Sequence, residues 1–244
     1  EVKEAGERVR TAIKNSGFEY PAKRTVVNLS PATMRKHGAS FDLPIAVAIL
    51  TALGQIEQPE KNCLIIGELS LGGSVKKVSG VLPIIMEAKE KGVKKCIVPL
   101  ENVSEASLVS EMEIIGAATL QEAVEVMRKK RKREETRRRV DLGKIDQGTA
   151  KFPDFADMKG QEFVKRAAEI AVAGGHYLLL IGPPGSGKSM TAKCIAGILP
   201  PLDLRESLEI TKIYSVLGLV DEKTPLIVDR CLLYTSPSPR DGAT

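Results

Sequence analysis

Apolar residues recur at helical spacing in the first part of the chain. From Val2 to Ile13 they lie three or four positions apart, and the run stops at Asn15-Ser16-Gly17, which predicts a helix with an ordinary end. Asp42 precedes an apolar run from Leu43 to Leu53 that ends at Gly54, which predicts a second helix. Further helical patterns cover residues 82–91, 104–109 and 120–130.

Short β-branched segments alternate with these helices. We expect strands at residues 25–29, 64–66, 96–98 and 113–115. Alternating helices and strands indicate a mixed α/β fold for this first part of the chain.

The periodic pattern breaks after Met127. Residues 128–139 are nearly all charged, and residues 140–153 have no sustained period and contain two glycines and a proline. We therefore predict a first domain over residues 1–127, a basic linker over 128–153 and a second domain over 154–230.

The second domain opens with an amphipathic helical pattern from Gln161 to Ala173. Residues 177–181 form an unbroken apolar run, which is typical of a strand buried on both faces of a parallel sheet. A glycine-rich turn follows, and then a predicted helix from Lys188 to Leu199 that Pro200-Pro201 ends.

Composition narrows the class of protein. With 244 residues, 43% hydrophobic and 27% charged, the chain is long enough for two packed domains and is neither collagen-like nor disordered throughout. No apolar run reaches the ~18 residues of a membrane span, and no signal peptide opens the sequence. The four cysteines lie far apart without a CxxC pair, so we expect neither zinc nor disulfides, and a cytoplasmic location.

The net charge of +5 comes from one segment. Residues 128–139 hold nine basic and two acidic residues, which is +7, so the rest of the chain sums to −2. We interpret this run as a solvated linker. The alternative is a contact with the phosphates of a nucleic acid, which such runs make without sequence preference.

The turn after the apolar run matches the phosphate-binding pattern GxxxxGK[ST] in full. Glycines let the backbone wrap closely around phosphate oxygens, and the following helix presents its positive N-terminus to the same anion. The lysine reaches the β- and γ-phosphates and the serine hydroxyl ligates Mg²⁺. We therefore predict binding of ATP with Mg²⁺ by the turn and the residue after it: Gly182, Pro183, Pro184, Gly185, Ser186, Gly187, Lys188, Ser189 and Met190, with Ser189 as the metal ligand.

Two ordered sets of motifs carry a family resemblance. The stretch from Ala173 to Gly185, with Lys159-Gly160-Gln161 upstream, resembles the magnesium-chelatase-like AAA+ ATPases of the YifB/ComM type. The first domain resembles the amino-terminal domain of the same family through Arg8-Val9-Arg10, Asn28-Leu29-Ser30-Pro31-Ala32 and Phe41-Asp42-Leu43-Pro44.

The resemblance implies more than the spacing does. It implies a Lon-protease-like α/β domain followed by the first half of a P-loop AAA+ domain, a homo-hexameric ring, and action on DNA in branch migration during transformation. It also places Gln161 near the adenine as a further nucleotide contact.

The sequence departs from the family pattern at both ends. Family members begin earlier and continue further, and residues 231–244 read as a foreign tail, so we expect a piece of a longer protein. We expect no catalytic residue within it, because the Walker B acids and the arginine finger would lie beyond. ATP would then be bound without efficient hydrolysis.

Three other functions share features with this sequence. A Lon-like peptidase needs a Ser/Lys dyad, but aligning the motifs puts Asp42 at the serine position and Leu82 at the lysine position. A chelatase-type ATPase subunit or another AAA+ remodelling protein shares the motor and stays the alternative. A small-molecule kinase is disfavoured by the long domain that precedes the phosphate-binding turn.

Overall fold

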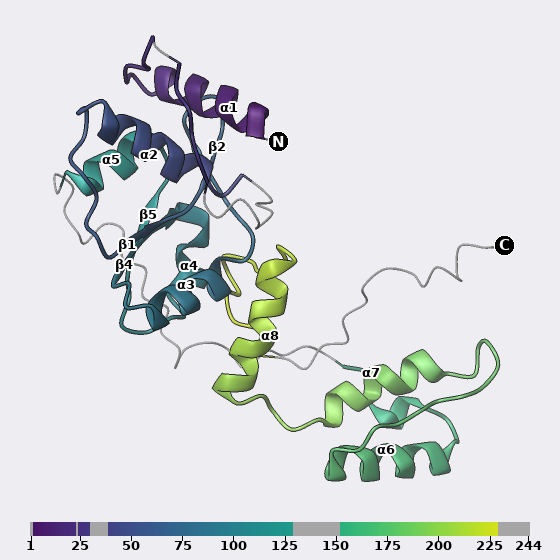
Figure 1. Cartoon of the computed structure of the whole chain (residues 1–244). Helices are drawn as coiled ribbons and strands as arrows, with labels where there is room; N and C mark the ends of the chain where they lie inside the picture. The colour runs from purple at the N-terminus through teal and green to yellow at the C-terminus, as the bar shows by residue number, and fades with distance from the viewer. Residues whose placement is uncertain (1, 23, 30–38, 129–151, 229–244) are drawn as a thin grey trace. The chain divides into compact units, whose positions relative to one another are not determined.

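The computed structural model describes residues 2–22, 24–29, 39–128 and 152–228, which form two compact units (Figure 1). Unit 1 contains the described residues up to 128 together with residues 208–226, and unit 2 contains residues 152–207 and 227–228. Residues 129–151 of the linker predicted over 128–153, and the tail at 231–244, lie outside the described residues.

Unit 1 is built on a three-stranded parallel sheet in the order β1-β4-β5. Its strands are β1 (Cys63–Ile65), β4 (Lys95–Pro99) and β5 (Glu113–Ala117), with Cys63 opposite Lys95 and Lys95 opposite Glu113. The strands predicted at 64–66, 96–98 and 113–115 are confirmed, and with them the α/β class.

Helices cover both faces of this sheet (Figure 1). On one face lie α1 (Val2–Asn15), α2 (Asp42–Ala52) and α5 (Leu120–Met127), and on the other lie α3 (Val81–Glu90) and the short α4 (Val103–Ala106). The main core forms on the first face, because apolar residues of these three helices meet those of the sheet. Its fully buried members include Ile13, Leu43, Leu50, Ile97 and Leu120.

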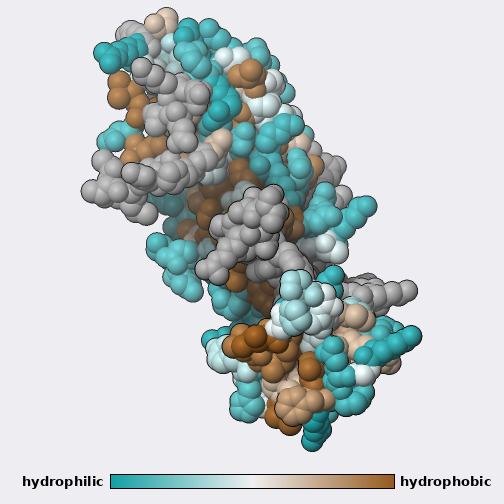
Figure 2. Space-filling model, turned by 90° about the vertical axis from the view of Figure 1, so that its right-hand side faces the viewer, coloured by the Kyte–Doolittle hydropathy of each residue, from teal (hydrophilic) through white to brown (hydrophobic). Residues whose placement is uncertain are grey.

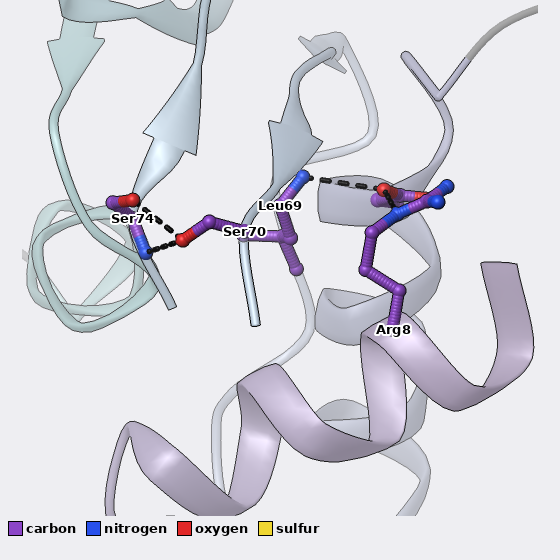
Figure 3. A network of polar contacts seen from close by, with 5 residues as sticks. Arg8, Leu69, Ser70 and Ser74 are labelled. Carbon is purple, nitrogen blue, oxygen red and sulfur yellow. Dashed lines mark hydrogen bonds and ion pairs between the residues drawn. The ribbon is translucent and has the colours of Figure 1, made fainter. Parts of the chain in front are cut away.

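A small antiparallel hairpin, β2 (Glu68–Leu69) with β3 (Val75–Lys76), was not predicted. Its turn is tight: Ser70 and Ser74 exchange backbone and hydroxyl bonds (Figure 3). Gly73 lies there at φ +83°, and a Cβ at this position would stand 2.1 Å from Ser16 Oγ, so the turn requires glycine. Strands of two residues are too short to show the period of two that sequence analysis needs.

Unit 1 also includes residues 208–226, which follow the predicted phosphate-binding turn in the sequence. Helix α8 (Leu204–Val216) runs from unit 2 into unit 1, and Ser215 near its end is buried. The Ser215 hydroxyl donates to Glu105, its carbonyl accepts from the N–H of Gly80 at 2.8 Å, and Lys77 donates to the carbonyl of Val220. Unit 1 is therefore discontinuous in sequence.

Unit 2 consists of the 3-10 turn η3 (Phe155–Asp157) and the helices α6 (Glu162–Gly174) and α7 (Lys188–Ile198), with the start of α8. The helices predicted over 161–173 and 188–199 are confirmed to within a residue. Figure 2 shows apolar side chains gathered at the surface of this unit. The large apolar residues that stand exposed in it are Phe163, Ile170, Tyr177, Leu178, Leu179, Ile181, Met190, Ile198 and Leu204.

Two strand predictions are wrong for the described residues. Residues 25–29 and 177–181 belong to no strand, and Val26, Tyr177 and Ile181 are 78%, 106% and 88% exposed. A strand needs a paired neighbour, and neither segment pairs with a described strand. None of the described helices is both long and apolar enough to cross a membrane.

Candidate nucleotide-binding site

The predicted phosphate-binding loop (residues 182–189) connects residues 177–181, which form no helix or strand, to α7. Gly185 and Gly187 have φ of +79° and +82°, a region that other L-residues rarely adopt. A Cβ on Gly182 would stand 2.9 Å from Ser186 Oγ, so a larger residue there would displace the Ser186 hydroxyl. The glycines of the sequence pattern therefore meet geometric demands of this turn.

Lys188 lies against the inside of this loop. Its Nζ donates to the carbonyl oxygens of Gly182 at 2.9 Å and Pro183 at 2.8 Å, and to Ser186 Oγ at 3.3 Å. No carboxylate pairs with this lysine within the described part of the chain. An anion in the loop would thus meet an ammonium group whose charge is not neutralised by a neighbour.

The start of α7 supplies the remaining groups. The carbonyl of Gly187 accepts from the N–H of Thr191 at 2.9 Å and from its hydroxyl at 3.0 Å, which fixes the first turn. The free N–H groups of that turn and the helix dipole favour an anion at this end. Ser189 and Met190 are exposed in the same turn, so the Ser189 hydroxyl is placed where a metal ion could reach it.

Gln161 lies against the loop. Its side-chain amide donates to the carbonyl oxygen of Ser186 at 3.3 Å, across 25 residues of sequence. Gly160 and Gln161 both have left-handed backbone, with φ of +70° and +59°, just before α6 begins. The structure thus brings Gln161 to the loop that the sequence pattern predicts.

A support beneath α7 was not predicted from the sequence. The hydroxyl of Thr191 also lies 3.8 Å from Met158 Sδ, and Cys194 Sγ lies 3.5 Å from the carbonyl oxygen of Asp154. Thr191, Cys194 and Met158 are all buried. The sequence predicted the helix but contained no signal for the segment that packs against it.

The two peptidase positions carry structural contacts instead of a dyad. Asp42 is 1% exposed in its side chain and accepts from Arg8 at 2.6 and 3.1 Å and from the N–H of Leu69 at 3.2 Å (Figure 3). The N–H of Leu82 donates to Glu105, which also accepts from Asn102 at 3.1 Å. Asp42 and Glu105 therefore hold elements of unit 1 together.

Unit 1 also contains an apolar groove of about 490 Å³. It lies between residues 24–29 and the outer face of α2, and its lining is apolar apart from Arg24, Thr25 and Asn28. None of the residues predicted to bind nucleotide lines it. The groove lacks the convergent polar groups that orient a nucleotide.

Comparison with known proteins gives matches over both units. Residues 1–102 match the family described as subunit ChlI of Mg-chelatase, and residues 154–237 match the family described as magnesium chelatase, subunit ChlI.

Three curated relatives show how similar known proteins are to this chain and how much of each protein the chain covers. Competence protein ComM of Haemophilus influenzae is 40% identical over 216 residues, which are 88% of this chain and 42% of that protein. Protein YifB of Escherichia coli is 41% identical over 218 residues, 89% of this chain and 42% of the relative. Lon protease 2 of Bacillus subtilis is 34% identical over 122 residues, 49% of this chain and 21% of the protease. The chain spans less than half the length of ComM and YifB.

Proposed function

The chain belongs to the magnesium-chelatase-like family of the ComM and YifB type, and from this premise we propose that residues 154–230 form the nucleotide-binding part of an AAA+ ATPase. The loop geometry carries the proposal. Lys188 lies inside a loop in which Gly185 and Gly187 have positive φ, at the N-terminus of an 11-residue helix. Residues 176–190 contain no acidic side chain, so the surroundings fit an anionic ligand.

ATP with Mg²⁺ is the ligand that these groups fit. The backbone N–H groups of residues 185–189 would hold the phosphates, Lys188 would neutralise the β- and γ-phosphates, and Ser189 would ligate the metal. We propose that the whole protein forms a homo-hexameric ring and that ATP hydrolysis in this ring drives its action on DNA.

Lys188→Ala tests the nucleotide site. Removing a charged donor that faces phosphate should weaken ATP·Mg²⁺ binding about 10- to 100-fold, because hydrogen bonds to charged groups contribute about 1.5–3 kcal/mol. Isothermal titration calorimetry on the folded chain measures this. Lys193→Ala is the matched control, since Lys193 is an exposed lysine of the same helix. Equal affinity of the Lys188 variant and the parent would refute the site.

We propose DNA as the partner on which the ATPase acts. A relative described as a competence protein supports this, and so does the basic run at residues 128–139, whose residues from 129 on lie outside the described part of the chain. A chelatase-type ATPase subunit is the alternative, and it would show no salt-dependent affinity for DNA.

Salt dependence of DNA binding distinguishes the roles of this run. Each neutralised phosphate contributes about −0.9 to the slope of log affinity against log salt, so four contacts would give roughly −4. Replacing Arg131, Lys132 and Arg133 with Gln should flatten the slope by up to about 3 and weaken binding to all sequences alike. Replacing Lys89, Lys91 and Lys94 removes the same charge from unit 1 and should leave the slope unchanged. An unchanged slope in the first variant would mean that the run is only a linker.

Peptidase activity is not proposed, although a Lon protease is among the relatives. The carboxylate of Asp42 stands at the position of the nucleophile and is engaged by Arg8 and by the N–H of Leu69. Ser40 is close in sequence, but none of the described residues offers its hydroxyl a base, and a hydroxyl without a base partner is a poor nucleophile.

A further inference from the structure

Gln161 combines an unusual backbone with a long-range contact. Among the described residues only Gln161 and Glu111 have positive φ without being glycine. An L-residue in this region costs roughly 1 kcal/mol relative to an ordinary conformation, and glycine would avoid that cost. Strain retained at a position next to a binding loop is a reason to look for what the side chain does there.

The side chain contacts the loop at one peptide group. Its amide donates to the carbonyl of Ser186, and that carbonyl belongs to the same planar peptide unit as the N–H of Gly187. In a trans peptide the C=O and N–H point to opposite sides. Holding the Ser186 oxygen toward Gln161 therefore aims the Gly187 N–H away from Gln161.

Ser186 is fixed at its other groups as well. Its N–H donates to the carbonyl of Pro183 at 3.3 Å, and its hydroxyl accepts from Lys188. An anion in the loop would compete for Lys188 with the carbonyl oxygens of Gly182 and Pro183. The bond from Gln161 comes from outside residues 182–189 and does not compete with that ligand.

We propose that Gln161 is a positioning residue of the phosphate-binding loop, which acts through the Ser186 carbonyl and not through the nucleotide base. The inference rests on the proposed function and changes the role that the resemblance gives to this residue. Loss of the side chain should weaken the binding of every ligand that carries the triphosphate, whether or not it carries a base.

Three ligands test this: ATP, GTP and inorganic tripolyphosphate, each with Mg²⁺, titrated calorimetrically into the full chain. Gln161→Asn keeps an amide and tolerates the left-handed backbone, but its side chain is one methylene too short to reach Ser186. We expect affinity for all three ligands to fall by a common factor of about 5, the effect of one uncharged hydrogen bond.

Gln161→Gly separates positioning from folding. Glycine relieves the positive φ, so the melting temperature should be unchanged or higher while triphosphate affinity falls as it does in the Asn variant. Gln121→Ala is the matched control, because Gln121 makes the same kind of bond, to the carbonyl of Ser16 at 2.8 Å, in unit 1. It should leave all three affinities unchanged.

Two results overturn the inference. Loss of affinity for ATP with tripolyphosphate unaffected would assign Gln161 to the base, and equal affinity of all variants for every ligand would leave it no role in binding. Failure of the proposed function gives different results. Either the unaltered chain would bind neither ATP nor tripolyphosphate, or the Lys188→Ala variant would bind both ligands as tightly as the unaltered chain does.

Discussion

Cys63 of β1 and Cys96 of β4 are thiols held in the protonated form by the fold. Burial raises the pKa of Cys63 to about 11, with Lys95 opposing the shift, and burial raises the pKa of Cys96 to about 12. Below about pH 9 both thiols are protonated in the folded and the unfolded chain, so their contribution to stability is present in full. As the pH rises from 9 toward 11, the unfolded chain loses its thiol protons first, and that contribution is lost.

We therefore expect the free energy of unfolding to fall more between pH 8 and pH 10.5 in the parent than in Cys63→Ala. Urea titrations of both proteins under reducing conditions measure the difference. Lysines and tyrosines titrate in the same range in both proteins, so only the difference between the two reports on the thiol. A parallel decline in parent and variant would show that Cys63 ionises in the folded state at its ordinary pKa.

At the scale of elements, the Asp42 carboxylate joins three of them. Asp42 is the first residue of α2, and its carboxylate pairs with Arg8 of α1 and accepts from the N–H of Leu69 in β2. Asp42→Ala leaves Arg8 without its carboxylate and the Leu69 N–H without an acceptor, and should cost about 3 kcal/mol of unfolding free energy. Asp42→Asn keeps an acceptor oxygen and should cost less. Urea unfolding of the full chain gives both values.

A more exposed ion pair within α1 is the control for this prediction. Glu7 and Arg10 approach to 3.9 Å, with the Glu7 side chain 77% exposed and the Arg10 side chain 49% exposed. Glu7→Ala should therefore change the unfolding free energy by less than about 0.5 kcal/mol. If Asp42→Ala were equally mild, the carboxylate would not be joining these elements.

The elements that the sequence predicted are those whose signal is local. The run from Val2 to Ile13 and the apolar run after Asp42 each contain enough turns to show a helical period, and both helices form there. The strands around Ile65, Ile97 and Ile115 also form, because each finds a parallel neighbour in unit 1.

The lack of strand pairing explains the two wrong strand predictions. Residues 25–29 and 177–181 have the β-branched or apolar composition of strands, but strand formation depends on a neighbour that composition does not supply. Helix α8 was missed for another reason. The residues that it buries are Ser207, Thr211 and Ser215, and polar residues of this type do not mark a buried helix face in a sequence.

The candidate site divides in the same way. The loop from Gly182 to Ser189 was predicted because its chemistry depends on residues adjacent in sequence. The bond from Gln161 to Ser186 was not, because it depends on how the start of α6 folds back on the loop. The positive φ of Gln161 could not be expected from a residue type that rarely adopts it.

At the scale of the whole molecule, the two units differ in how much apolar surface they bury. Unit 1 has a core of large residues such as Ile13, Leu50 and Leu82. The buried apolar side chains described in unit 2 are mostly small: Met158, Ala168, Ala171, Cys194 and Ala196. Unit 2 should therefore be the less stable unit.

We expect two transitions in differential scanning calorimetry, with the lower one due to unit 2. ATP·Mg²⁺ at 100 times its Kd should stabilise unit 2 by about 2.7 kcal/mol, and the upper transition should not move. The Lys188→Ala variant should show no such shift. A single transition that moves as a whole with nucleotide would show that the two units unfold together.

The discontinuity of unit 1 has a consequence for synthesis on the ribosome. Its sheet is complete once β5 has been made, but Ser215 and Val220, which bond to Glu105 and Lys77, are translated about 100 residues later. At a typical 5–20 residues per second, the nascent amino-terminal half waits about 5–20 s for its last segment. During that interval the phosphate-binding loop emerges, so a chain stalled after residue 207 should be cleaved near α3 by added protease, and one that has released residue 226 should resist.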